Sequence, residues 1–198
     1  MANPHFQNLI HWAGNTVATK AKKDLPMFQQ YASDQTFYGY SNDFFTYTAG
    51  DWTITSTDGG SDSGEVIGTT SSAGGALIIT TNDADNDSEE LQLKGEAFKL
   101  STSKKAYFST RFKLSDATQS DMLIGLTITD TTAIDAVTDG VWFGKDDGDT
   151  NLDFVVEKDG TETESAAIAT LADDTFVTAT WFIDPDRDAV YYSINNAE

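Results

Sequence analysis

The segment Met122–Thr129 reads Met-Leu-Ile-Gly-Leu-Thr-Ile-Thr, and its pattern decides the fold class. Its even-numbered positions hold Met, Ile, Leu and Ile, whereas its odd-numbered positions hold Leu, Gly, Thr and Thr. Successive side chains of a β-strand point to opposite faces of the sheet. This period of two therefore predicts a half-buried strand.

The same alternation recurs along the chain after Lys104. The segment Leu152–Glu157 (LDFVVE) repeats it, and so does Thr175–Ile183 (TFVTATWFI), in which Val, Ala, Trp and Ile share one parity. Further strands are predicted at Trp52–Thr55, Glu65–Ile67, Ala76–Thr81, Glu89–Leu93, Phe98–Leu100, Lys104–Leu114, Val141–Gly144 and Ala189–Ile194. So many short strands separated by polar turns predict an all-β fold.

Asp-Gly pairs mark two of the expected turns. Asp147-Gly148 supplies the positive backbone φ angle that a tight hairpin needs. Asp159-Gly160 is expected to begin a Thr/Glu-rich connection, followed by a short strand at Ala166–Leu171. Asp184–Asp188 is predicted to be a tight turn.

Composition limits the class of protein. The chain has 198 residues, 39% of them hydrophobic, which suits one β domain with a real core. It contains no cysteine, so neither disulfides nor a cysteine-based metal or thiol site is available. There is no apolar run long enough for a membrane helix and no signal-peptide pattern, so we expect no membrane partner and synthesis in a cytoplasm.

The charge is strongly negative and unevenly distributed. The formal net charge is −20, from 32 acidic and 12 basic residues, which argues against nucleic acid as a partner of the body. Residues 1–23 contain Lys20, Lys22 and Lys23 but no acidic residue. We therefore expect either a frayed terminus or a basic arm that docks on an acidic neighbour, a sister subunit included.

The first 30 residues do not have a strand pattern. Phe6, Leu9, Ile10 and Trp12 have a loose helix-like spacing, and they would be costly to expose on a free arm. We therefore divide the chain into an N-terminal arm, residues 1–30, and a β-sandwich domain, residues 31–198. The residues expected to dock on a neighbouring protein or a sister subunit are Phe6, Leu9, Ile10, Trp12, Lys20, Lys22 and Lys23.

Two other features have more than one interpretation. The aromatic-rich segment 31–50 could stack on sugar rings, although packing in the core or an interface is the simpler explanation. The acidic loops Asn82–Ser88 and Asp146–Asn151 resemble calcium loops in composition, but they lack the spacing of an EF-hand, and hairpin chemistry explains the second. No metal or cofactor is predicted.

Three segments resemble a family of bacteriophage virion proteins: Ser115–Thr132 (SDATQSDMLIGLTITDTT), Asp139–Asp159 (DGVWFGKDDGDTNLDFVVEKD) and Ala169–Val177 (ATLADDTFV). The resemblance covers roughly residues 45 to 195 and does not include the arm. It implies a jelly-roll, concanavalin-like antiparallel β-sandwich. It also implies a further hairpin and closing strand after Asn195, so we expect either that the chain is truncated there or that the sheet is left with an open edge, which invites pairing with another chain.

The resemblance also implies a function. Members of the family are virion structural, decoration or head-fibre proteins. We expect a capsid decoration (cement) protein, assembled in the host cytoplasm, that binds the major capsid protein on the outer capsid surface as a homotrimer. The alternative is a glycan-binding head-fibre or tail adhesin module, for which Tyr38 and Trp142 are candidate sugar-contacting residues.

Catalysis is not predicted. Glucanases with related folds carry a Glu-x-Asp-x-x-Glu strand motif, which is absent from this sequence. Asp153 and Glu157 share a parity, but four residues of strand separate them by about 13 Å at about 3.3 Å per residue. Retaining glycosidases need carboxylates about 5 Å apart. His5 and His11 both lie in the arm, so a histidine-based triad or metal cluster is not expected.

Overall fold

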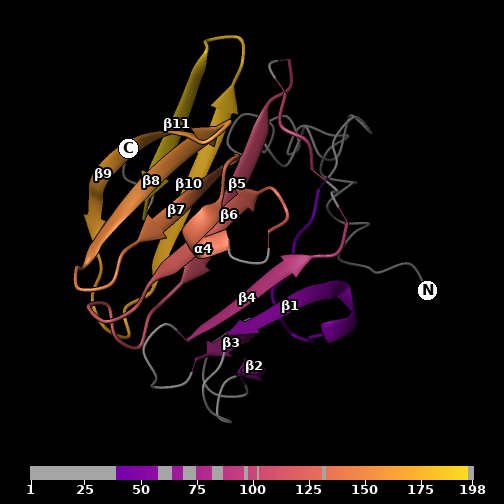
Figure 1. Ribbon diagram of the computed structural model, residues 1–198, viewed down its shortest axis with the longest axis vertical. Helices are drawn as coiled ribbons and strands as arrows, with labels where there is room; N and C mark the ends of the chain where they lie inside the picture. The colour runs from indigo at the N-terminus through magenta and orange to yellow at the C-terminus, as the bar shows by residue number, and fades with distance from the viewer. Residues whose placement is uncertain are drawn as a thin grey trace, which may run out of the picture. The chain divides into compact units, whose positions relative to one another are not determined.

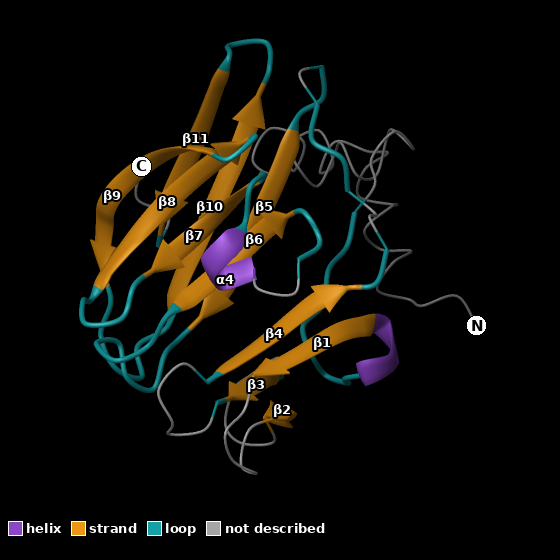
Figure 2. Cartoon of the chain, in the orientation of Figure 1, coloured by secondary structure: helices purple, strands orange, loops and turns teal. Residues whose placement is uncertain are grey.

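The computed structural model describes residues 39–57, 64–68, 75–81, 87–95, 98–101, 103–130 and 133–195. The chain divides after Asn42 into two units, and every described strand belongs to the second, Asp43–Glu198. The described residues are dominated by strands (Figure 2). The strands are β1 (Trp52–Thr57), β2 (Gly64–Gly68), β3 (Ala76–Thr80), β4 (Ser88–Leu93), β5 (Ala106–Phe112), β6 (Met122–Thr127), β7 (Gly140–Lys145), β8 (Asn151–Lys158), β9 (Thr161–Thr170), β10 (Val177–Asp184) and β11 (Ala189–Ile194). Two short helical turns, a 3-10 turn at Ala49–Asp51 and α4 at Ala133–Ala136, complete the described elements.

The strands form antiparallel sheets. Four consecutive strands make one sheet in the order β6-β7-β8-β9, and a second sheet has the order β11-β10-β5 (Figure 1). Two smaller sheets pair β1 with β4 and β2 with β3. The predicted all-β class is therefore confirmed, and the arrangement is consistent with a β-sandwich.

One core lies between the four-stranded and three-stranded sheets. Phe143 and Leu152 of the first sheet and Trp181 of the second are each fully buried, and all three belong to one cluster. The Trp181 ring stacks on Phe108 of β5 with ring centroids 5.5 Å apart. The parity predicted for β6, β8 and β10 is confirmed, because the apolar positions of each strand face this core.

The predicted turn at Asp147-Gly148 is present, and Asp159-Gly160 forms a direct hairpin turn between β8 and β9. Gly148 has φ 81°, and the turn between β8 and β9 has φ 51° at Asp159 and φ 71° at Gly160. Two consecutive positive φ angles define the mirror-image turn that suits a two-residue hairpin. The expected Thr/Glu connection after Gly160 was wrong, because Thr161–Thr170 is one continuous strand. Phe98–Leu100, expected as a strand, has no strand structure.

The small β1–β4 sheet is tied to the loop after β6 by one side chain. The Gln92 amide nitrogen donates to the carbonyl oxygen of Asp130, and the Asp130 amide donates back to Gln92 Oε1 at 3.3 Å. Reciprocal bonds of this kind fix both position and orientation. They hold the β4 strand against the end of the four-stranded sheet.

Candidate binding surfaces

All seven residues predicted to dock on a capsid or a sister subunit lie outside the described residues, and so does Tyr38. The two histidines lie there as well. The surfaces that the structure does describe are the outer faces of the two large sheets and the loops that join them. These two outer faces differ sharply in chemistry.

The outer face of the three-stranded sheet carries a row of aromatic rings. Register pairs Phe182 with Tyr107 on one side and with Tyr191 on the other, so the three side chains lie side by side across β5, β10 and β11. Tyr107 is 47% exposed and Tyr191 is 45% exposed. Phe108 and Trp181, their neighbours on β5 and β10, belong to the core, and Tyr192 on β11 lies against the core residue Phe154, so these rings belong to the opposite, solvent side. We call this surface the aromatic face.

A row of hydroxyl groups follows on the same face. Ser109, Thr180 and Ser193 lie opposite one another in register, and the Ser109 and Thr180 hydroxyl oxygens are 3.1 Å apart. One row further, the Arg111 guanidinium lies over the Phe176 ring, 3.7 Å from its centroid. Such a cation–π contact fixes the guanidinium plane beside the face.

The carboxylate at the other end of the aromatic face is neutralised. Asp184 Oδ1 lies 3.4 Å from the Lys105 ammonium, and Asp184 Oδ2 lies 3.8 Å from Arg187 Nε. The pKa of Lys105 is raised, chiefly by its hydrogen bond to Asp186 and then by the charge of Asp184. The described part of this face therefore presents aromatic and hydroxyl groups without an unpaired acid, in a chain of net charge −20.

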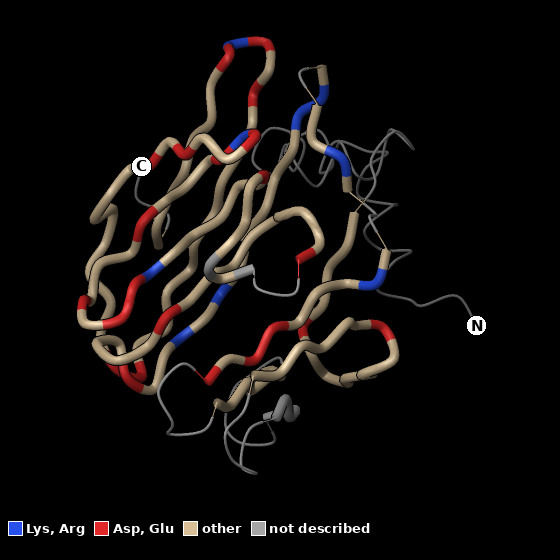
Figure 3. The backbone as a smooth tube through the Cα atoms, in the orientation of Figure 1, with Lys and Arg blue, Asp and Glu red and all other residues tan. Residues whose placement is uncertain are grey.

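The outer face of the four-stranded sheet is acidic. Acidic residues recur along strands β8 and β9 (Figure 3). Register places Glu162 of β9 directly opposite Glu157 of β8, with Glu164 and Asp153 on the same side. The pKa of Glu164 is raised, first by lost hydration and then by the charges of Asp153 and Glu162. Like charges opposite one another on a sheet are unfavourable unless water or a cation screens them, so the β8–β9 part of this face concentrates negative charge that needs such screening.

Trp142 does not belong to any exposed platform. It is 7% exposed and packs with Val137 and Val155 in a second small cluster on the outer side of the four-stranded sheet. The interpretation of Trp142 as a sugar-contacting residue was therefore wrong. A shallow, open hollow of about 100 Å³ beside it is lined in part by Glu157 and Glu162. This volume is well below that of small-molecule sites, which is about 300 Å³ or more.

A buried lysine lies at the start of the Asp146–Asn151 loop. The Lys145 side chain, in a residue only 2% exposed, donates to the carbonyl oxygens of Ser120 and of Asp146, the latter at 2.8 Å. A third carbonyl, that of Thr118, lies at 3.5 Å. The ammonium group thus supplies the positive charge that these oxygens attract, and it fastens the β5–β6 loop to the β7–β8 hairpin.

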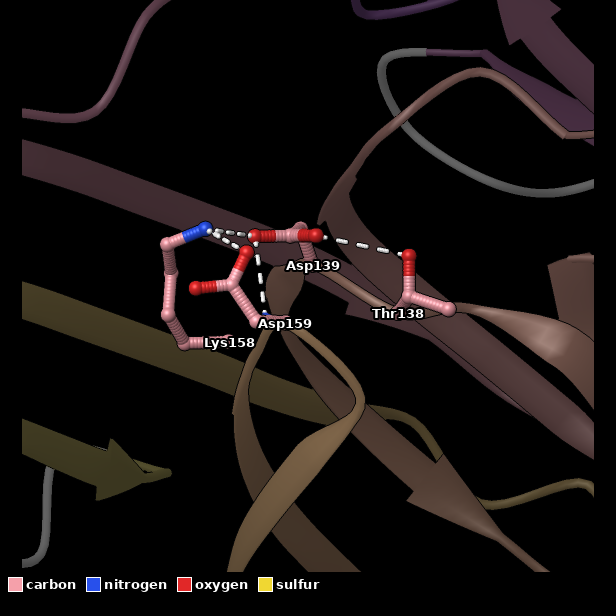
Figure 4. Close-up of polar contacts among 4 residues, drawn as sticks. All are labelled: Thr138, Asp139, Lys158 and Asp159. Carbon is pink, nitrogen blue, oxygen red and sulfur yellow. Dashed lines mark hydrogen bonds and ion pairs between the residues drawn. The ribbon is translucent and has the colours of Figure 1, made fainter.

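Another polar cluster fastens the β8–β9 turn (Figure 4). The Lys158 ammonium donates to Asp139 Oδ1 at 2.5 Å and to Asp159 Oδ1 at 2.8 Å, while the Thr138 hydroxyl donates to Asp139 Oδ2 at 3.3 Å. These partners raise the pKa of Lys158 to about 12, Asp139 first, and the Lys158 hydrogen bond lowers the pKa of Asp139. The role of this cluster is structural, because each charged group is used in holding the turn.

One member of the Asp153–Glu157 carboxylate pair is engaged elsewhere. Asp153 Oδ1 accepts a hydrogen bond from the Ala167 amide at 2.6 Å, where β8 and β9 shift register in a bulge. Among the described residues, there is no group of three or more His, Cys, Asp or Glu side chains that could hold a metal ion. In this described part no helix is long and apolar enough to cross a membrane.

Comparison with known proteins returns no relative. No protein-family model, no curated protein and no solved structure matches the chain. The functional argument therefore rests on the surfaces themselves. The aromatic row is the feature that sequence reasoning missed, because its three residues are far apart in sequence and only the strand register brings them together.

Proposed function

We propose that the chain is a bacteriophage virion protein that decorates the outer capsid surface and stabilises the head. The observation that carries this proposal is the division of charge. Residues 1–23 hold three lysines and no acid, which leaves nine basic and 32 acidic residues in the rest of the chain. The acidic outer face of the four-stranded sheet adds to this asymmetry, with carboxylates of Glu157 and Glu162 placed opposite one another.

In this proposal the two parts have different tasks. The arm docks on the major capsid protein or on a sister subunit. Its apolar anchors are Phe6, Leu9, Ile10 and Trp12, and its basic patch is Lys20, Lys22 and Lys23. Buried aromatic and aliphatic anchors usually supply most of the binding energy at an interface. The acidic body stays in solvent, where its charge keeps a crowded capsid surface soluble.

The assembly follows from the symmetry of a capsid. A homotrimer at threefold or quasi-threefold positions would match neighbouring capsomers by closed cyclic symmetry. Many copies would then bridge capsomers and oppose the outward pressure of packed DNA. For the fold we propose the jelly-roll order of concanavalin-like sandwiches. In its support, the chain changes sheet between β5 and β6 and again between β9 and β10.

We propose a binding role without catalysis. Its support is that the carboxylates on the outer face of β8 and β9 lie on an open surface, and that Asp153 is committed to the bulge at Ala167. The alternative function, a glycan-binding fibre or adhesin, is favoured by a separate observation, the aromatic face.

Co-sedimentation with capsids tests the proposal. Capsids of the encoding phage, assembled without this protein, are mixed with the full chain and pelleted. We expect saturable binding that is lost when Lys22 and Lys23 are both changed to Glu. The matched control changes Lys99 and Lys104 to Glu, two exposed lysines of the body, and alters the net charge by the same amount. Equal binding by both variants would move docking away from the arm, and failure of the unchanged chain to bind would overturn the proposal.

A further inference from the structure

We propose that the aromatic face binds a neutral polysaccharide that lies across strands β5, β10 and β11. The inference does not depend on capsid decoration, because the residues that carry it belong to the β-body and not to the arm. It gives the body of the protein a binding partner of its own. Tyr107, Phe182 and Tyr191 are the residues that would contact the sugar rings.

The spacing of the aromatic row suits an extended glycan. Neighbouring strands of a sheet lie about 4.8 Å apart, so one ring on each of three adjacent strands spans about 10 Å. The rise per sugar of an extended polysaccharide is of the same order as one strand spacing. Each ring of the row can therefore meet a successive sugar, and the apolar face of a pyranose suits the flat face of an aromatic side chain.

The hydroxyl row supplies the polar half of the recognition. Ser109, Thr180 and Ser193 lie two residues along their strands from the aromatic row, a distance of about 7 Å at about 3.3 Å per residue. A hydroxyl both donates and accepts, so this row can pair with sugar hydroxyls of either sense. A docked protein would be expected to need a broader apolar patch, whereas here the apolar surface is one ring wide and bordered by hydroxyls.

Charge selects a neutral glycan over an acidic one. The described part of the face has no unpaired carboxylate, since Asp184 is held by Lys105 and Arg187. The molecule as a whole carries −20, however, and would repel uronate or sulfate polymers at long range. Arg111 cannot easily reach such a polymer because its guanidinium lies over Phe176.

The test is binding of the purified full chain to soluble polysaccharides, without capsids. Affinity electrophoresis in gels that contain laminarin, dextran or hyaluronan compares two neutral polymers with an acidic one. We expect retardation by at least one neutral polymer and none by hyaluronan. Tyr107→Ala and Tyr191→Ala should each weaken binding about tenfold, as removal of one stacking partner does. Tyr107→Phe should retain most of it.

The controls test whether binding needs the aromatic face itself or any exposed aromatic side chain. Phe45 is 72% exposed and lies outside the aromatic face, so Phe45→Ala should leave binding unchanged. Thermal unfolding of each variant checks that the fold is intact. No retardation by any polymer on a wider array of neutral glycans would overturn the inference. Retardation that survives the combined Tyr107→Ala and Tyr191→Ala changes would overturn it as well. Because capsids are absent, neither outcome depends on the decoration proposal.

Discussion

The shared core of the two large sheets can be tested at Phe143. This side chain is 0% exposed, and its ring centroid lies 5.3 Å from that of Phe154. A buried phenylalanine removes about 150 Å² or more from water, which at about 25 cal/mol per Å² is about 4 kcal/mol. Truncation to alanine also leaves a cavity, and measured losses for such changes are about 3–5 kcal/mol. Phe143→Ala should therefore remove a large part of the stability expected for a domain of this size.

Urea unfolding followed by tryptophan fluorescence measures this loss, since Trp181 and Trp142 are both buried in the native state. With a urea dependence of about 2 kcal/mol per molar, the midpoint should fall by about 2 M. The matched control is Phe45→Ala, which removes the same group from a position that is 72% exposed and should cost less than about 0.5 kcal/mol. A loss below about 1 kcal/mol for Phe143→Ala, or one equal to the control, would refute the shared core.

Three further predictions concern the packing at Gly125 and the polar contacts of Lys145 and Asp139. A Cβ atom at Gly125 would clash with the Val141 carbonyl oxygen, so Gly125→Ala should lower the free energy of unfolding by about 2 kcal/mol or more. Gly50→Ala, whose Cβ would make only an ordinary contact with Thr48 at 3.8 Å, should change it little in the same urea titration. Lys145→Met keeps the bulk of the side chain but strips three carbonyl oxygens of their cation, and calorimetry should show a loss of about 1–3 kcal/mol. Because the pKa of Asp139 is lowered in the folded protein, the stability that its carboxylate contributes is complete above pH 3.8 and is lost as pH falls through its folded-state pKa. The melting temperatures of the unchanged chain and of Asp139→Asn should therefore converge below pH 3.8. A difference in melting temperature between these two proteins that stays constant from pH 7 to pH 2.5 would contradict this role of Asp139.

The stability that Lys158 contributes to the same polar cluster is lost at high pH, whereas that of Asp139 is lost at low pH. The pKa of Lys158 is raised from 10.5 to about 12, so its stabilisation is complete below pH 10.5 and is lost as pH rises through about 12. The two shifts together define a window from about pH 4 to about pH 10.5 in which the β8–β9 turn is fully fastened.

Local patterns were enough to predict the strands that face the core. The alternation in Met122–Thr127 and Val177–Asp184 survives in the structure because one face of each strand is buried and the other is not. The Asp159-Gly160 turn was also predictable, since few other residues accept two consecutive positive φ angles. Strand β9 was misread because Glu162 and Glu164 alternate with threonine on an exposed edge, where no apolar periodicity marks a strand.

The candidate surfaces could not be predicted from local patterns. Trp142 sits on the outer parity of its strand, and it is buried there by packing with Val137, from the segment after α4, and with Val155 of β8. The aromatic row needs the pairing of β5 with β10 and of β10 with β11, which joins Tyr107 to a residue 84 positions later in the sequence. Long-range register of this kind is set by the whole fold and not by any one segment.

Electron cryo-microscopy of phage heads tests the central claim most directly. Heads assembled with and without this protein would be compared after icosahedral averaging. The account predicts additional density on the outer surface at threefold or quasi-threefold positions, with an all-β body projecting outward and a thin connection to the capsid. Identical outer surfaces in the two reconstructions, with the protein found elsewhere on the virion or not at all, would contradict it.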